Sequence, residues 1–99
     1  MLDVELTFTA EVWVYTSTAS WYFVTLPDDI AEQVKFFRGS PKGFGSVAVA
    51  ARVGKTKWQT RLFPNKGVKS FILPLKADVR KAEGISVGDS LDVTLFLDI

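Results

Sequence analysis

The sequence contains no cysteine and no histidine. Without cysteine the chain can form no disulfide, no thiolate nucleophile and no zinc–thiolate site. Without histidine it lacks the most common general base, the most common transition-metal ligand and the usual side-chain switch near neutral pH. These two absences remove most routes to nucleophilic and metal-assisted catalysis, and we expect no metal site.

A hydrolase built without these residues would need two carboxylates with tuned pKa values or an activated lysine. The closest carboxylate pairs are Asp28 with Asp29 and Asp89 with Asp92. Asp28 and Asp29 are better explained as the start of a helix, and Asp89 as a turn residue. We therefore predict that the protein is not an enzyme and uses no cofactor.

Long apolar runs are also missing. None approaches the roughly 18 residues that a membrane span needs. Asp3 and Glu5 stand near the amino terminus, where a secretory signal would carry positive charge. The 99 residues, of which 47% are hydrophobic, suffice for one domain with a real core. We expect a soluble, cytoplasmic protein with residues 1–99 in a single domain and no contact with membranes.

Charge of one sign is absent from whole segments of the chain. No acidic residue lies between Gln33 and Ala77, and no basic residue precedes Lys35. The formal net charge of +1 therefore conceals acidic ends and a basic middle. This pattern indicates either an electrostatic surface for an anionic partner or pairing between oppositely charged strands.

Alternation of apolar and polar residues predicts a mainly β fold. The expected elements are a strand at 2–14, a strand at 21–26, a short helix after Pro27, strands at 46–53, 57–63 and 68–73, a helix at about 76–83 and a strand at 91–99. In the first helix, Ile30, Ala31, Val34 and Phe37 share one face. Gly84 suits the left-handed end of the second helix.

The second half of the chain repeats the order of the first. A shift that places Phe23 on Phe71 also places Val14 on Leu62. Because this shift is even, Trp58 should point inward as Val14 does. Two β-β-α-β halves, residues 1–53 and 54–99, predict a closed or split β-barrel with two short helices.

Several segments also carry a family resemblance. They are Gly43-Phe44-Gly45-Ser46-Val47, Trp58-Gln59-Thr60-Arg61-Leu62-Phe63-Pro64, Ile72-Leu73-Pro74-Leu75-Lys76, Val79-Arg80-Lys81-Ala82-Glu83-Gly84 and Val87-Gly88-Asp89-Ser90-Leu91-Asp92-Val93. Together they resemble the bacterial family called domain of unknown function 1905. The resemblance implies a double-split β-barrel, the architecture of the AbrB and MazE transcription-factor and antitoxin domains, built here from one chain. It implies no activity, and Arg61 departs from the small hydroxyl residue that is frequent in the family.

The basic middle of the chain supplies the candidate binding residues. Those for partner binding are Arg38, Lys42, Arg52, Lys55, Lys57, Trp58 and Arg61. Arg52 to Arg61 surround an expected hairpin at Gly54. Arg38 and Lys42 belong to the glycine-rich loop 38–46, which could hold an anion, although a plain connection is the favoured interpretation. The alternative is cross-strand pairing of these cations with carboxylates on the first and last strands, which the sequence favours. Those carboxylates are Asp3, Glu5, Glu11, Asp92 and Asp98.

The predicted function is that of a non-enzymatic binding module for an anionic or protein partner. One alternative is a DNA-binding domain of the AbrB and MazE type. Another is a barrel that binds a small molecule, with aromatic residues lining the site. The aromatic candidates are Trp13, Trp21, Tyr22, Phe44 and Trp58.

Overall fold

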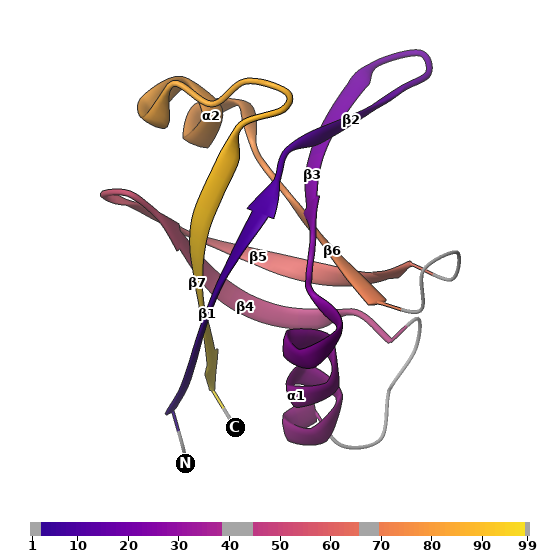
Figure 1. The fold of residues 1–99 in the computed structure, drawn as a ribbon, viewed down its shortest axis with the longest axis vertical. Helices are drawn as coiled ribbons and strands as arrows, with labels where there is room; N and C mark the ends of the chain where they lie inside the picture. Colours follow the sequence, from indigo (N-terminus) through magenta and orange to yellow (C-terminus); the bar gives the residue numbers. More distant parts are fainter. Residues whose placement is uncertain (1–2, 39–44, 66–69, 99) are drawn as a thin grey trace.

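The computed structural model describes residues 3–38, 45–65 and 70–98. Its elements are β1 (Asp3–Glu11), β2 (Trp13–Thr16), β3 (Ser20–Thr25), α1 (Asp28–Arg38), β4 (Val47–Val53), β5 (Thr56–Asn65), β6 (Ser70–Pro74), α2 (Ala77–Glu83) and β7 (Ser90–Asp98). The predicted mainly β fold with two short helices is confirmed (Figure 1). Neither helix in these ranges is long and apolar enough to cross a membrane.

The strands form one curled antiparallel sheet of seven strands, in the order β1-β7-β4-β5-β6-β3-β2. β1 and β2 lie at opposite ends of this order, although only Val12 separates them in the sequence. The sheet must therefore curl back on itself, and it forms a half-barrel around the core (Figure 1). Val24, Leu62, Leu73 and Leu95 fill the inside and are each fully buried.

The strand predicted at residues 2–14 is broken at Val12. The N–H of Val12 donates to the carbonyl of Asp89 at 2.9 Å, and its carbonyl accepts from the N–H of Gly88 at 2.9 Å. The turn before β7 thus takes both backbone groups of Val12, and the chain passes from pairing with β7 to pairing with β3. The prediction of one continuous strand was wrong because the residues that interrupt it lie far along the chain.

β5 also changes its partner along its length. Thr56 to Leu62 pair with β4, and Phe63 to Asn65 pair with β6. Pro64 lies in the second part. Because β4 no longer pairs there, one edge of the strand needs no N–H donor and can hold a proline. The strand was predicted to end at Phe63, whereas it continues to Asn65.

Reciprocal hydrogen bonds join the two halves. Leu26 N–H donates to the carbonyl of Phe71 at 3.0 Å, and Leu75 N–H donates to the carbonyl of Tyr22 at 2.8 Å. Tyr22 and Phe71 therefore take equivalent places, whereas the sequence alignment placed Phe23 on Phe71. The predicted alignment is one residue out between β3 and β6, and the internal repeat itself stays a prediction.

The apolar face predicted for α1 is confirmed. Ile30, Ala31 and Val34 are all buried against the core. Carboxylates lie in the first turn and Lys35 and Arg38 in the last, as the helix dipole favours. This packing places Arg38 at the end of α1, where it contacts Gly45 just before β4 begins.

Candidate partner-binding surface

Side chains of β4 and β5 alternate between the core and the outer face of the sheet. The register pairs Arg52 with Lys57, and all the cations of this hairpin are exposed. Lys55 lies at the turn, directly after Gly54. The structure thus brings together four predicted residues, which we call the cationic face: Arg52, Lys55, Lys57 and Arg61.

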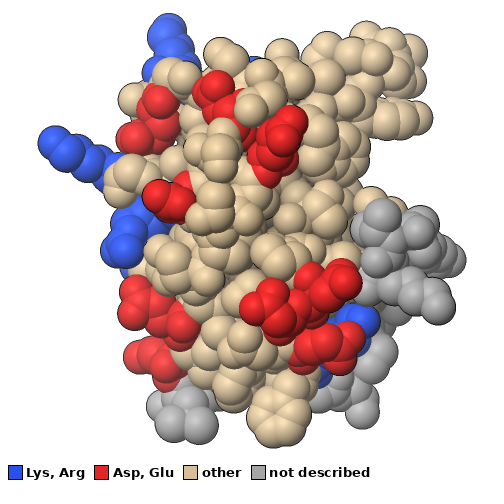
Figure 2. Space-filling model, viewed as in Figure 1, with Lys and Arg blue, Asp and Glu red and all other residues tan. Residues whose placement is uncertain are grey.

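Among the side chains that the structure describes, no ion pair joins the cationic face to a carboxylate. The sequence favoured such pairing, but β7 and β4 lie between the carboxylates of β1 and the cations of β5. On β7, Asp92 instead accepts a hydrogen bond from the hydroxyl of Thr9 at 2.8 Å. Figure 2 shows the result: carboxylates spread over the face in front, and Lys and Arg side chains project at the left margin, where Figure 1 places the hairpin tip. The favoured pairing hypothesis is therefore wrong for the carboxylates of β1 and for Asp92, while the side chain of Asp98 lies outside the described part of the chain.

Two members of the cationic face contact the ring of Phe96 on β7. The Nζ atom of Lys57 lies 4.2 Å from the ring centroid, and the Cζ atom of Arg52 lies 5.3 Å from it. Each such contact contributes about 0.5–1 kcal/mol at an exposed site. The ring orders both side chains without neutralising their charge.

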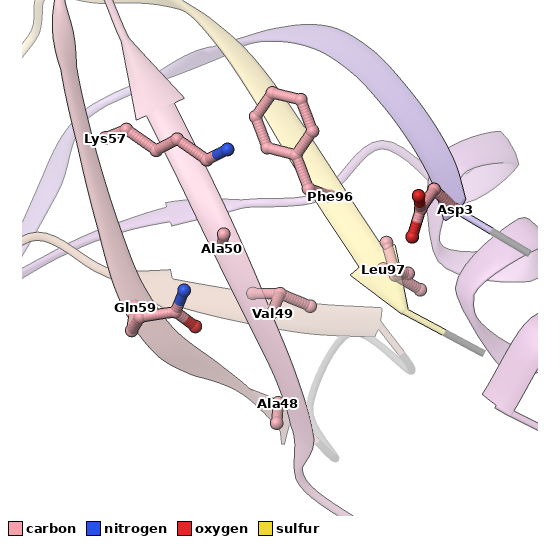
Figure 3. Close-up of a pocket in the computed structure, with 8 residues that line it drawn as sticks. All are labelled: Asp3, Ala48, Val49, Ala50, Lys57, Gln59, Phe96 and Leu97. Carbon is pink, nitrogen blue, oxygen red and sulfur yellow. The ribbon is translucent and has the colours of Figure 1, made fainter. Parts of the chain in front are cut away.

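Small side chains leave a hollow beside these cations. It has a volume of about 610 Å³ and is lined by Asp3, Ala48, Val49, Ala50, Lys57, Gln59, Phe96 and Leu97. In Figure 3, Lys57 points from β5 towards Phe96, Gln59 points from the same strand towards Val49, and the carboxylate of Asp3 lies on the far side. One wall of the hollow is therefore cationic and the opposite wall is acidic.

Arg61 is held at the other end of the hairpin. Its Nε donates to the hydroxyl of Ser46 at 3.0 Å, and its Nη2 lies 3.5 Å from the carbonyl of Ser46. A shorter side chain at this position could not reach across in this way. Arg61 therefore adds a fixed positive charge to the outer face.

Two other candidates lie elsewhere. Arg38 donates from Nη1 to the carbonyl of Gly45 at 3.0 Å, and its guanidinium lies 5.4 Å from the ring centroid of Phe71. Trp58 lies on the opposite side of β5 and packs against the core. Arg38 Nε and Trp58 Nε1 are buried and have no hydrogen-bond partner in the described part of the chain. Arg38 and Trp58 therefore stay outside the cationic face, and Lys42 lies outside the described residues with most of its loop.

The contact that holds the hairpin tip was not predicted from the sequence. The hydroxyl of Thr56 donates to the carboxylate of Glu83 at 2.6 Å. The same carboxylate fills the space beside Gly54, so that a Cβ atom there would collide with it. α2 therefore fixes the turn that carries Lys55, and the only signal of this in the sequence is Glu83 within the family motif.

The aromatic candidates do not converge on one pocket. Trp13 lies with its ring centroid 5.0 Å from that of Phe23, and its Nε1 donates to the hydroxyl of Thr25 at 2.9 Å. Trp21 and Tyr22 line a separate hollow of about 180 Å³, where the Arg80 guanidinium lies 3.9 Å from the Tyr22 ring centroid. A further candidate, Phe44, lies outside the described residues.

The ranges that the structure describes contain no group of three or more acidic residues arranged to hold a metal ion.

The molecule is a curled antiparallel half-barrel that carries a cationic hairpin. The chain belongs to the family described as domain of unknown function (DUF1905), which matches residues 8–95. This confirms the family indicated by the sequence motifs. No curated protein matches the sequence.

Proposed function

We propose that the protein is a non-enzymatic binding module that binds an anionic partner on its cationic face. The observation that carries the proposal is the exposure of the four cations on one hairpin with no carboxylate partner among the described residues. A partner's anions can pair with these cations without displacing any internal salt bridge. Complementary charge of this kind speeds association and fixes orientation.

The acidic wall of the same outer face restricts the shape of the partner. β1 lies three strand spacings from β5, which is about 14 Å. An extended acidic segment of a protein can lie along the β4–β5 hairpin and keep clear of Asp3 and Glu5. A wide polyanion would meet both signs of charge. An acidic polypeptide segment is therefore the partner that this surface fits best.

Duplex DNA is the second candidate, since the family resemblance implies the barrel architecture of the AbrB and MazE domains. The same cations support it, and the carboxylates of β1 oppose it. A small molecule in the hollow is the third candidate, because its volume of about 610 Å³ lies within the usual range of about 300–1,000 Å³ for ligand sites.

Fluorescence anisotropy at low salt tests these candidates with a labelled polyglutamate peptide and a labelled DNA duplex. We expect the peptide to bind more tightly than the duplex. The substitution Ala50→Leu fills the hollow without changing any charge, and we expect peptide binding to survive it. Tighter binding of the duplex would favour DNA, loss of peptide binding in Ala50→Leu would place the ligand in the hollow, and no binding of either probe would contradict the proposal.

A further inference from the structure

β1 is an edge strand that leaves a row of its backbone groups unpaired. It lies at one end of the sheet, and among the described residues it pairs only with β7. The register continued past Glu11 sets Val12 opposite Asp89, and the Val12 N–H donates to the Asp89 carbonyl at 2.9 Å. Because backbone groups point to alternate edges along a strand, the even-numbered residues of β1 bond to β7 and the odd-numbered ones point away. The outward residues, all exposed, are Asp3, Glu5, Thr7, Thr9 and Glu11.

The far side of β7 gives the same assignment. The two-residue turn between β4 and β5 makes Val53 bond to β5, so the backbone groups of Arg52 bond to Thr94 on β7. The next β7 residue, Val93, therefore bonds to Phe8, which is an even-numbered residue of β1. Within the described ranges, no hydrogen bond reaches the N–H or C=O groups of the outward residues. The open edge, as we call it, is thus ready to pair with another strand.

The corresponding edge of β5 is bridged instead of open. Lys76, just before α2, donates from Nζ to the carbonyl of Gln59 at 3.2 Å, and Glu83 of α2 holds Thr56. A helix that covers a strand edge keeps other chains from pairing with it. In the part of the chain that the structure describes, no hydrogen bond joins α1 to β1 in this way.

The side chains along the open edge differ between the two faces of the sheet. Asp3 and Glu5 are exposed on the outer face, and neither carboxylate has a cation partner among the described side chains. On the inner face, Leu6 and Phe8 are buried in the core. A strand added to this edge continues both faces, because its alternate side chains lie beside those of β1. The strand that fits has Lys or Arg on one face and apolar residues on the other.

A second copy of the chain fits the open edge less well than such a strand. β1 carries Asp3, Glu5 and Glu11 and no basic residue, so two paired copies of it would add acidic charge to acidic charge. Charged side chains along an edge strand are a usual protection against pairing between identical edges. A basic partner strand gains attraction from the same carboxylates.

We propose that the open edge of β1 binds an extended segment of another protein in which basic and apolar residues alternate. The segment adds to the sheet as a further strand, and its backbone bonds to the N–H and C=O groups of Asp3, Glu5 and Thr7. In strand addition of this kind, main-chain hydrogen bonds give affinity and alternate side chains give specificity. The cationic face lies on β4 and β5, so this site is independent of the acidic partner.

Amide hydrogen exchange tests the proposal, with a short peptide of alternating Lys and Val as the probe. In the free protein we expect fast exchange at Thr7, whose N–H points outward, and slow exchange at Phe8, whose N–H bonds to β7. Saturating peptide should slow exchange at Thr7 at least about tenfold and leave Phe8 unchanged. A peptide of the same composition, with its Lys and Val in separate blocks, is the control and should give no protection.

Two substitutions separate the backbone from the charge. Thr7→Pro removes an outward N–H without breaking a bond to β7, and we expect it to abolish binding of the alternating peptide in an anisotropy titration. Asp3→Lys should weaken binding at least about threefold, whereas Asp78→Lys makes the same change at an exposed position on α2 and should have little effect. Binding of polyglutamate should survive Thr7→Pro, which distinguishes a failure at this edge from a failure of the cationic face.

Several results would overturn the proposal. These are no binding of the alternating peptide, equal binding of the block peptide, or fast exchange at Thr7 in the saturated complex. Protection of Thr7 that rises with protein concentration and needs no peptide would identify a second copy as the occupant and overturn it as well. Circular dichroism checks the fold of each variant, and if Thr7→Pro does not fold, hydrogen exchange in the wild type decides.

Discussion

The hydroxyl of Thr56 donates a 2.6 Å hydrogen bond to the carboxylate of Glu83, joining the start of β5 to the end of α2. Glu83 also lies against Gly54, so one carboxylate holds both sides of the hairpin turn. The turn carries Lys55, the member of the cationic face that lies at the hairpin tip. The position of a predicted binding residue therefore depends on a helix that has no other role in the surface.

This hydrogen bond can be measured by a double-mutant cycle. Thr56→Val and Glu83→Gln each weaken or remove the bond, and urea unfolding gives the free energy of unfolding of both variants and of the double variant. Because the acceptor is charged but the bond is only partly buried, we expect a coupling free energy of about 1–2 kcal/mol. Additive effects would show that Thr56 and Glu83 act independently.

The two glycines on either side of this contact provide a matched pair. Gly54 has φ +58° and Gly84 has φ +62°, so alanine is strained at both positions. At Gly54 the added Cβ would also collide with Glu83, whereas at Gly84 it would meet no atom within 4 Å. We expect Gly54→Ala to lower the free energy of unfolding by clearly more than the roughly 1 kcal/mol expected for Gly84→Ala.

The excess should come from Glu83 itself. In a Glu83→Ala background, we expect the cost of Gly54→Ala to fall to that of Gly84→Ala. Thermal or urea unfolding of the four variants measures both differences. An unchanged excess in the Glu83→Ala background would mean that the turn is strained for another reason.

The break at Val12 predicts an unusual pattern of hydrogen exchange. Val12 and Gly88 lie outside the strands, but their N–H groups donate to Asp89 and Val12 respectively. We therefore expect both amides to exchange as slowly as those of the paired residues in β7. Fast exchange at these two positions would show that the turn does not hold the strand break in solution.

The ring of Phe96 should influence binding more than folding. Phe96→Leu keeps an apolar side chain but removes the ring that Lys57 and Arg52 contact. We expect less than about 1 kcal/mol of lost stability and a severalfold weaker affinity for polyglutamate, because the two cations lose their fixed positions. Anisotropy and urea unfolding measure these effects, and an unchanged affinity would show that the ring does not position the cations.

Local patterns were enough to place most elements. Alternation located β4 and β5 and the hairpin at Gly54, because each depends on residues close in sequence. The buried face of α1 followed from the spacing of Ile30, Ala31 and Val34 in the same way. These are the parts of the fold that local chemistry determines.

The errors arose where distant segments meet. Val12 breaks the first strand because the turn at Gly88 and Asp89 bonds to it, and no local feature of Val12 signals this. The expected charge pairing failed because the strand order, which is a tertiary property, separates β1 from β5. Arg38 carries the same charge as Lys55 in the sequence, but in the fold it contacts Phe71 and Gly45.

The central claim, that the cationic face binds an acidic partner, is tested most directly by one pair of charge reversals. Lys55→Glu changes the hairpin tip, and Lys81→Glu makes the same change at an exposed position on α2. Anisotropy of labelled polyglutamate is measured against both variants and the wild type over a series of salt concentrations. The account predicts affinity that falls with salt in the wild type, a strong loss in Lys55→Glu and little change in Lys81→Glu. Equal losses in the two variants would show that only net charge matters and would contradict a defined binding face.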